Sequence, residues 1–227
     1  MITDESKPRG TQPLTDRRLR TPRAAALAGI VFAVLSIVAM ALIQTAIPAD
    51  PPADPGWLTK DKGQVSVAVT LVPFAAIAFL WFIGVLRDLL GRREDQFFAS
   101  VFLGSGLLFL GALFVWTGAI AAALASSNAS PVEFAESPAY VFAGSLIIVM
   151  DVVALRMAGV FMLAAATMWL RTGAMARWLV ILTYAGALAL LIGGPALRPV
   201  RLAFPVWVLV VSIIILIRPR RATAGNG

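Results

Sequence analysis

Residues 98–125 read FASVFLGSGLLFLGALFVWTGAIAAALA, 28 residues without one charged side chain. A helix needs about 20 apolar residues to cross about 30 Å of hydrocarbon, so this stretch predicts a transmembrane helix. Five similar stretches accompany it, and ionised side chains are almost confined to the gaps between them. The six predicted spans are residues 24–47, 65–86, 98–125, 140–170, 178–194 and 202–217. The sequence therefore predicts an all-α, polytopic membrane protein with six transmembrane helices in one bundle.

The composition agrees with a chain dissolved in a membrane. Hydrophobic residues make up 59% of the 227 residues, and the mean hydropathy is +0.87, which excludes a water-soluble domain with a polar surface. The six spans form one predicted domain, residues 24–217. A basic tail at residues 1–23, expected to be disordered, and a short basic tail at residues 218–227 flank this domain.

Cysteine and histidine are both absent. Their absence removes disulfides, thiol nucleophiles, imidazole bases and the usual ligand sets for zinc, copper and haem. We therefore predict no catalytic, metal-binding or cofactor-binding residue, and no cofactor.

The net charge is +7, and the basic residues lie mainly in gaps that would face one side of the membrane. This distribution is typical of a protein in a lipid bilayer, so we predict no binding of nucleic acid. Fourteen Lys and Arg lie in the tails and in the second and fourth gaps, against four in the other gaps. This bias predicts that both termini are cytoplasmic. One feature is discordant, because Arg198 and Arg201 lie in a gap predicted to be external, between two short spans. A hairpin that dips into the membrane without crossing it twice is therefore the alternative for the last two spans.

Small residues recur every seven positions in the third and fourth spans. Such a repeat lays a narrow stripe along one helix face and lets two helices approach closely. We predict that these two spans pack as an antiparallel pair, with Gly118 facing Asp151 at nearly equal depth. The stripe comprises Gly104, Gly111, Gly118 and Ala125 in one helix and Gly144, Asp151, Ala158 and Ala165 in the other.

Asp151 is the only carboxylate inside a predicted span. An ionised side chain at the centre of a membrane helix costs roughly 2.5–3.5 kcal/mol, which makes such a residue a functional candidate. We predict a polar site in which Arg156 modulates Asp151 and Thr117 supplies a hydroxyl partner. The alternatives are that Asp151 is hydrated at the outer surface or specifies helix register, and that Arg156 snorkels toward outer phosphates.

Four blocks carry a resemblance to a known group of proteins. They are PFAAIAFLWFIGVLRD from Pro73, REDQFFASVFLGSGLLFL from Arg93, ALRMAGVFMLAAATMWLRTGAMARW from Ala154 and FPVWVLVVSIIIL from Phe204. Together they resemble multi-pass membrane proteins of high-GC actinobacteria, a group with no established activity. The resemblance implies a bacterial plasma membrane and says nothing about a substrate.

Three functional hypotheses follow from these observations. A structural or accessory membrane protein, which binds a second copy or another membrane protein, fits the scarcity of polar groups. The alternative is a small transporter or channel that uses Asp151 as its single ion- or proton-coupling residue. A membrane enzyme is least favoured, because an intramembrane aspartyl mechanism needs a second Asp on another span, and the sequence has none there.

Overall fold

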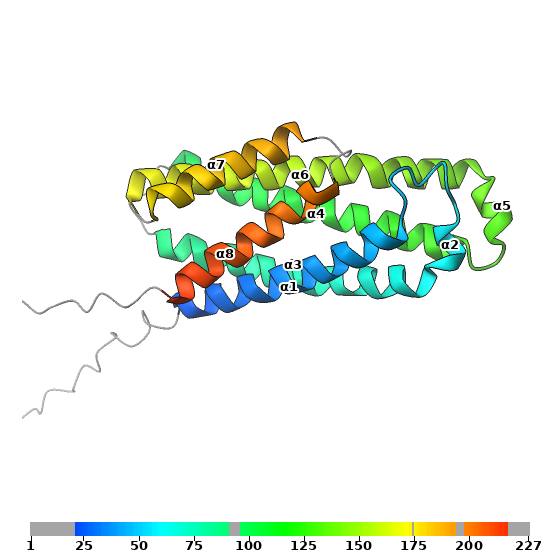
Figure 1. The fold of residues 1–227 in the computed structure, drawn as a ribbon, viewed down its shortest axis with the longest axis horizontal. Helices are drawn as coiled ribbons and strands as arrows, with labels where there is room; N and C mark the ends of the chain where they lie inside the picture. Colours follow the sequence, from blue (N-terminus) through cyan, green and yellow to red (C-terminus); the bar gives the residue numbers. More distant parts are fainter. Residues whose placement is uncertain (1–20, 91–95, 174, 194–197, 218–227) are drawn as a thin grey trace, which may run out of the picture.

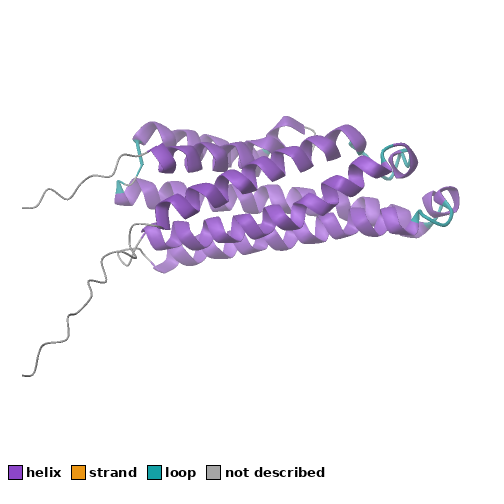
Figure 2. Cartoon of the chain, turned by 90° about the horizontal axis from the view of Figure 1, so that it is seen from below, coloured by secondary structure: helices purple, strands orange, loops and turns teal. Residues whose placement is uncertain are grey.

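The computed structural model describes residues 21–90, 96–173, 175–193 and 198–217. Every regular element within these ranges is a helix, so the prediction of an all-α fold is confirmed. Figure 2 shows helix throughout the bundle, with the loops gathered at its ends. The predicted tails lie outside the described residues, except that residues 21–23 form the first turn of the first helix.

The helices follow the predicted apolar stretches and extend several of them. Those that overlap the predicted spans are α1 (Thr21–Ala46), α3 (Lys62–Leu90), α4 (Gln96–Ser126), α6 (Pro138–Thr172), α7 (Arg177–Ile192) and α8 (Ala203–Ile217). The connections add three short elements, α2 (Trp57–Lys60), α5 (Pro131–Ala135) and the 3-10 helix η2 (Arg198–Leu202).

Five of the described helices are long and apolar enough to cross a membrane. Their apolar segments are Arg23–Ala46, Lys62–Gly84, Phe97–Ser126, Pro138–Thr172 and Val200–Ile217. Helix α7 is apolar but has only 16 residues. At about 1.5 Å per residue it is about 24 Å long, shorter than the hydrocarbon layer. The length and composition of these five helices indicate a membrane protein, and the count of six full crossings stays a prediction.

The long helices form two antiparallel pairs, one of α1 with α3 and one of α4 with α6 (Figure 1). Helix α7 packs on α6, and α8 runs obliquely across the bundle from α6 to the beginning of α1. The start of α1 and the end of α8 therefore lie at the same end of the bundle. Because α7 and α8 are short, α6 extends well beyond them toward α5 (Figure 1).

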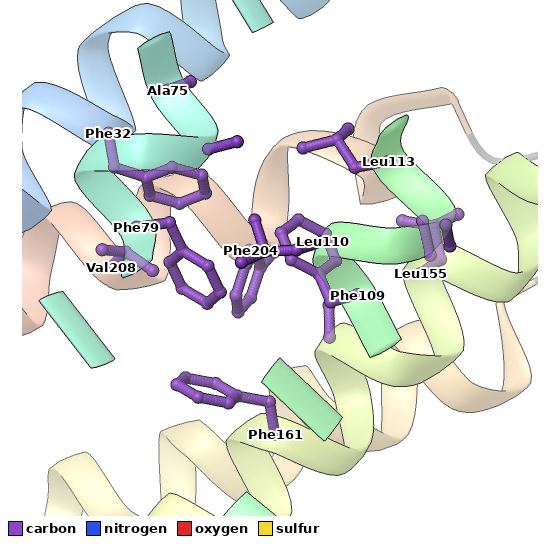
Figure 3. Packing of buried hydrophobic residues seen from close by; sticks show 14 of the residues in the cluster. Phe32, Ala75, Phe79, Phe109, Leu110, Leu113, Leu155, Phe161, Phe204 and Val208 are labelled. Atoms are coloured by element: carbon purple, nitrogen blue, oxygen red, sulfur yellow. The ribbon is translucent and has the colours of Figure 1, made fainter. Parts of the chain in front are cut away.

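Aromatic side chains fill the centre of the bundle, and five helices contribute them (Figure 3). Phe204 of α8 is central, with ring centroids 4.8 Å from Phe109 of α4 and 5.5 Å from Phe79 of α3. Phe32 of α1 and Phe161 of α6 also contact Phe204. Because lipid is as apolar as these rings, dispersion contacts between closely fitted rings stabilise such a bundle more than hydrophobic transfer does.

Gly29 of α1 marks the closest approach between α1 and α8. A Cβ atom placed there would lie 2.0 Å from Oγ of Ser212 in α8 and 2.8 Å from the Phe82 ring of α3. Only glycine leaves space for this three-helix contact, so the oblique course of α8 depends on that position.

The seven-residue repeat of α4 faces the opposite way from the prediction. Gly111 and Gly118 are exposed, and a Cβ atom at either would meet nothing within 4 Å. Gly104 also has open space around it. The buried repeat of α4 lies two positions earlier and is formed by large residues, Phe102, Phe109 and Trp116, followed by Ala123.

Helix geometry accounts for this correction, since residues two positions apart point about 200° apart around a helix. A glycine two positions after a buried aromatic residue therefore faces outward, and Gly118 does not face Asp151. In α6 the predicted residues Gly144, Asp151, Ala158 and Ala165 are all buried. Asp151 and Ala158 line a cavity together with Phe109 and Trp116 of α4. Large residues of α4 thus oppose small residues of α6.

Candidate functional site

Asp151 of α6 forms an ion pair with Arg201 of η2. Its Oδ2 atom lies 2.8 Å from Nη2 of Arg201, and the two side chains are 6% and 16% exposed, respectively. Because η2 runs directly into α8, Arg201 stands immediately before the point where α8 begins. The pair therefore fixes the start of α8 to the middle part of α6.

The structure does not bring the other two predicted site residues to Asp151. The hydroxyl of Thr117 donates to the carbonyl oxygen of Leu113, 2.7 Å away in the same helix. Arg156 is exposed on the surface of α6, and its five-residue offset from Asp151 places it on another face of that helix. The arginine that lies beside Asp151 is Arg201 and not Arg156. Its only signal in the sequence was the discordant pair of arginines between the last two spans.

The ion pair leaves hydrogen-bonding capacity unused. Among the described groups, Nε of Arg201 is buried without a hydrogen-bond partner, and Oδ2 of Asp151 is buried with the Arg201 guanidinium as its contact. A buried ion pair offsets its desolvation cost only when further hydrogen bonds satisfy its remaining donors and acceptors. Bound water is the usual way to satisfy such atoms where there is space beside them.

Two small cavities flank the pair, and both are lined by Asp151, Arg201 and Trp116. The inner cavity, of about 40 Å³, extends toward the aromatic core and is also lined by Ser36 of α1 and Phe204. The outer cavity, of about 20 Å³, extends toward the loop that follows α1. Each has room for one or a few water molecules beside the polar atoms, and neither has room for a larger ligand.

The loop between α1 and α2 covers the outer cavity. Pro48, Ala49 and Pro51 line that cavity directly. Tyr140 at the start of α6 holds this loop in place, because the Tyr140 hydroxyl donates a hydrogen bond to the carbonyl oxygen of Pro51. Tyr140 in turn accepts a hydrogen bond of 3.2 Å from Nε1 of Trp57 in α2.

Gly144 explains why this loop fits so closely against α6. A Cβ atom at that position would lie 2.7 Å from Cγ and 3.1 Å from N of Pro52. The glycine of the predicted helix-packing stripe thus accommodates the loop rather than α4. The ion pair is enclosed by this loop on one side and by the aromatic core on the other.

Polar contacts also join α7 to its neighbours. Nε1 of Trp207 in α8 donates to Oγ1 of Thr183 in α7 over 2.9 Å, and the hydroxyls of Thr167 in α6 and Tyr184 in α7 lie 2.9 Å apart. Interhelical hydrogen bonds of this kind stabilise membrane helix pairs by about 0.6 kcal/mol on average. The helices α7 and α8 therefore form a hairpin attached to α6 by the ion pair and by these hydroxyl contacts.

The described residues contain no cluster of three or more acidic, cysteine or histidine side chains that could hold a metal ion. No carboxylate pair lines either cavity at the ion pair. The site can therefore hold one carboxylate and one guanidinium, with space for water beside them, inside an otherwise apolar helix bundle.

The chain has no match among known protein families, curated proteins or solved structures. The resemblance to actinobacterial membrane proteins therefore stays a prediction.

Proposed function

We propose that this chain is a structural or accessory component of a bacterial plasma membrane, which acts by helix–helix contacts with a second copy or with another membrane protein. The support comes from the site itself. The one carboxylate within the apolar segments is held in an ion pair with Arg201, beside the aromatic core. Such a site stabilises a defined helix arrangement more readily than it moves a solute.

We propose that both termini are cytoplasmic, as the excess of basic residues in the tails and in two gaps favours. With Arg171 at the cytoplasmic headgroups, Asp151 lies 20 residues away, about 30 Å along α6. The ion pair then stands at the outer edge of the hydrocarbon layer. The α7–α8 hairpin returns the chain to the cytoplasmic side whether or not it crosses fully.

The proposed contact face is the outward side of α4 at Gly111 and Gly118. Small residues at a seven-residue spacing allow close approach of another helix, and here no helix of the described chain occupies that space. Leu107 and Phe114, both exposed, flank the two glycines. This face therefore offers a partner helix open space at each glycine, next to larger exposed side chains on the same stripe.

A cysteine at position 118 tests the contact face, because the chain has no cysteine of its own. We expect Gly118→Cys to give cross-linked dimers in membranes when a short bis-maleimide is added, since two stripes in contact place the thiols close together. Leu188→Cys on the exposed surface of α7 is the matched control and should stay monomeric. Gly111→Leu, which fills the stripe, should abolish the Gly118→Cys cross-link without unfolding the chain.

A cross-link to a different protein would support the accessory role and identify the partner. Equal yields from Gly118→Cys and Leu188→Cys would contradict the proposed contact face.

A second candidate function is favoured by the two cavities, which approach the Asp151 carboxylate from opposite sides. In this reading the chain is a small transporter that couples to protons at Asp151. Proteoliposomes with a pH-sensitive dye inside should then acidify under an imposed pH gradient. Asp151→Asn should abolish the flux, because an amide cannot carry the proton, whereas Arg156→Gln should leave it intact. A flux no greater than that of empty liposomes would exclude this function.

A further inference from the structure

A wide hollow on the surface of the described bundle lies between α1 and α3, and neither residue of the ion pair lines it. It is an open groove of about 700 Å³ that runs from Ala24 to Leu35 on α1 and from Phe74 to Trp81 on α3. Half-buried Ala28 and Ala78 form its floor, and large exposed side chains such as Leu27 and Phe74 form its walls. We call it the α1–α3 groove.

The length of the α1–α3 groove matches one leaflet. Eleven helical steps separate Ala24 from Leu35, about 17 Å, and half of the hydrocarbon layer is about 15 Å. The groove ends there and does not continue along the rest of α1. A transmembrane helix of a partner would need a groove along the whole bundle, whereas one acyl chain of one leaflet fits this length.

Charge at the open end of the groove specifies the headgroup. The groove starts one residue from Arg23, which is exposed in the first turn of α1. Side chains of α1 lean toward its beginning, so Arg23 extends toward the headgroup level above the groove. A guanidinium at that level favours a phosphate group and an anionic lipid over a zwitterionic one.

We propose that the α1–α3 groove binds an anionic glycerophospholipid of the leaflet at the arginine-rich end, with one acyl chain in the groove and its phosphate at Arg23. The inference rests on the membrane setting of the chain. It does not rest on the partner contact at α4, which lies on another helix pair.

Trp81 provides the reporter, because it lines the groove and is 66% exposed. The full chain is placed in phosphatidylcholine vesicles that contain a small fraction of phosphatidylglycerol with brominated acyl chains, which quench tryptophan at contact range. The Trp81 signal is the difference between the wild-type chain and Trp81→Phe. We expect Trp81 to be quenched about fivefold more strongly by brominated phosphatidylglycerol than by brominated phosphatidylcholine at the same mole fraction.

Two variants separate the headgroup from the groove. Arg23→Gln should lower the ratio of quenching by phosphatidylglycerol to quenching by phosphatidylcholine from about five to about one. Arg156→Gln, which removes an exposed arginine on α6, should leave this ratio unchanged. Ala28→Leu, which raises the groove floor, should weaken the quenching of Trp81 by both lipids.

Two results would overturn the proposal. Quenching of Trp81 in proportion to mole fraction for both lipids would mean that the groove meets only bulk lipid. No quenching by either lipid would mean that protein covers the groove, such as a second copy of the chain. Cross-linking at Gly118 depends on neither result, so the failure of one proposal leaves the other intact.

Discussion

Asp151→Asn should lower the free energy of unfolding by about 3–5 kcal/mol, the cost of leaving one charge of a buried pair without its partner. The amide has nearly the size of the carboxylate that it replaces, so the loss would come from the uncompensated guanidinium of Arg201 and not from a packing defect. The measurement is titration of the purified chain with SDS in mixed micelles, followed by tryptophan fluorescence. For a chain of this size the loss corresponds to a fall in Tm of roughly 6–20 °C.

The double variant Asp151→Asn with Arg201→Gln isolates the pair. Once both charges are gone, no charge remains buried, so the double variant should be more stable than either single variant. Arg156→Gln is the matched control, because Arg156 is exposed and should contribute less than about 0.5 kcal/mol. If the losses of the two single variants simply add in the double variant, Asp151 and Arg201 do not stabilise each other.

Phe204→Ala should cost about 3 kcal/mol, because it removes the ring that contacts Phe32, Phe79, Phe109 and Phe161. This value lies at the lower end of the range for Phe→Ala in soluble cores. The reason is that lipid is as apolar as the core, so moving the side chain from the core to lipid costs little free energy. The cost that remains is that of the lost ring contacts and of the cavity.

The same SDS titration measures this loss, and Phe142→Ala provides its control on the exposed surface of α6. The control should change the free energy of unfolding by less than about 0.5 kcal/mol. A cavity of this size can also take up a small apolar molecule, so benzene should recover part of the lost stability of Phe204→Ala and none in the wild-type chain. Equal losses for Phe204→Ala and Phe142→Ala would show that the ring cluster does not hold the bundle together.

Helix positions could be predicted because hydropathy and charge mark them directly. The predicted span 98–125 became α4, residues 96–126, and the predicted span 140–170 became α6, residues 138–172. The orientation of α4 could not be obtained in the same way. Its glycine repeat and its aromatic repeat share the seven-residue period, and both faces are apolar. The usual rule that hydrophobic residues face inward therefore cannot choose between them in lipid.

Asp151 could be singled out because it is the only carboxylate in any predicted span. Its partner could not, since Arg201 follows 50 residues later and belongs by hydropathy to a gap between spans. The shortness of α7, which ends beside the middle part of α6, lets η2 bring the two charges together. Proximity in the sequence favoured Arg156 as the residue that acts on Asp151, but Arg156 lies on another face of α6.

The attachment of the α7–α8 hairpin through Arg201 has a consequence for the order of membrane insertion. A charged side chain at the edge of the hydrocarbon layer costs less free energy when an opposite charge pairs with it. Asp151 is synthesised 50 residues earlier and meets the same difficulty until Arg201 arrives. The two segments therefore assist each other's integration, and the hairpin can settle only after α6 has been delivered to the bilayer. We expect the ion pair to form late in assembly, when η2 reaches α6.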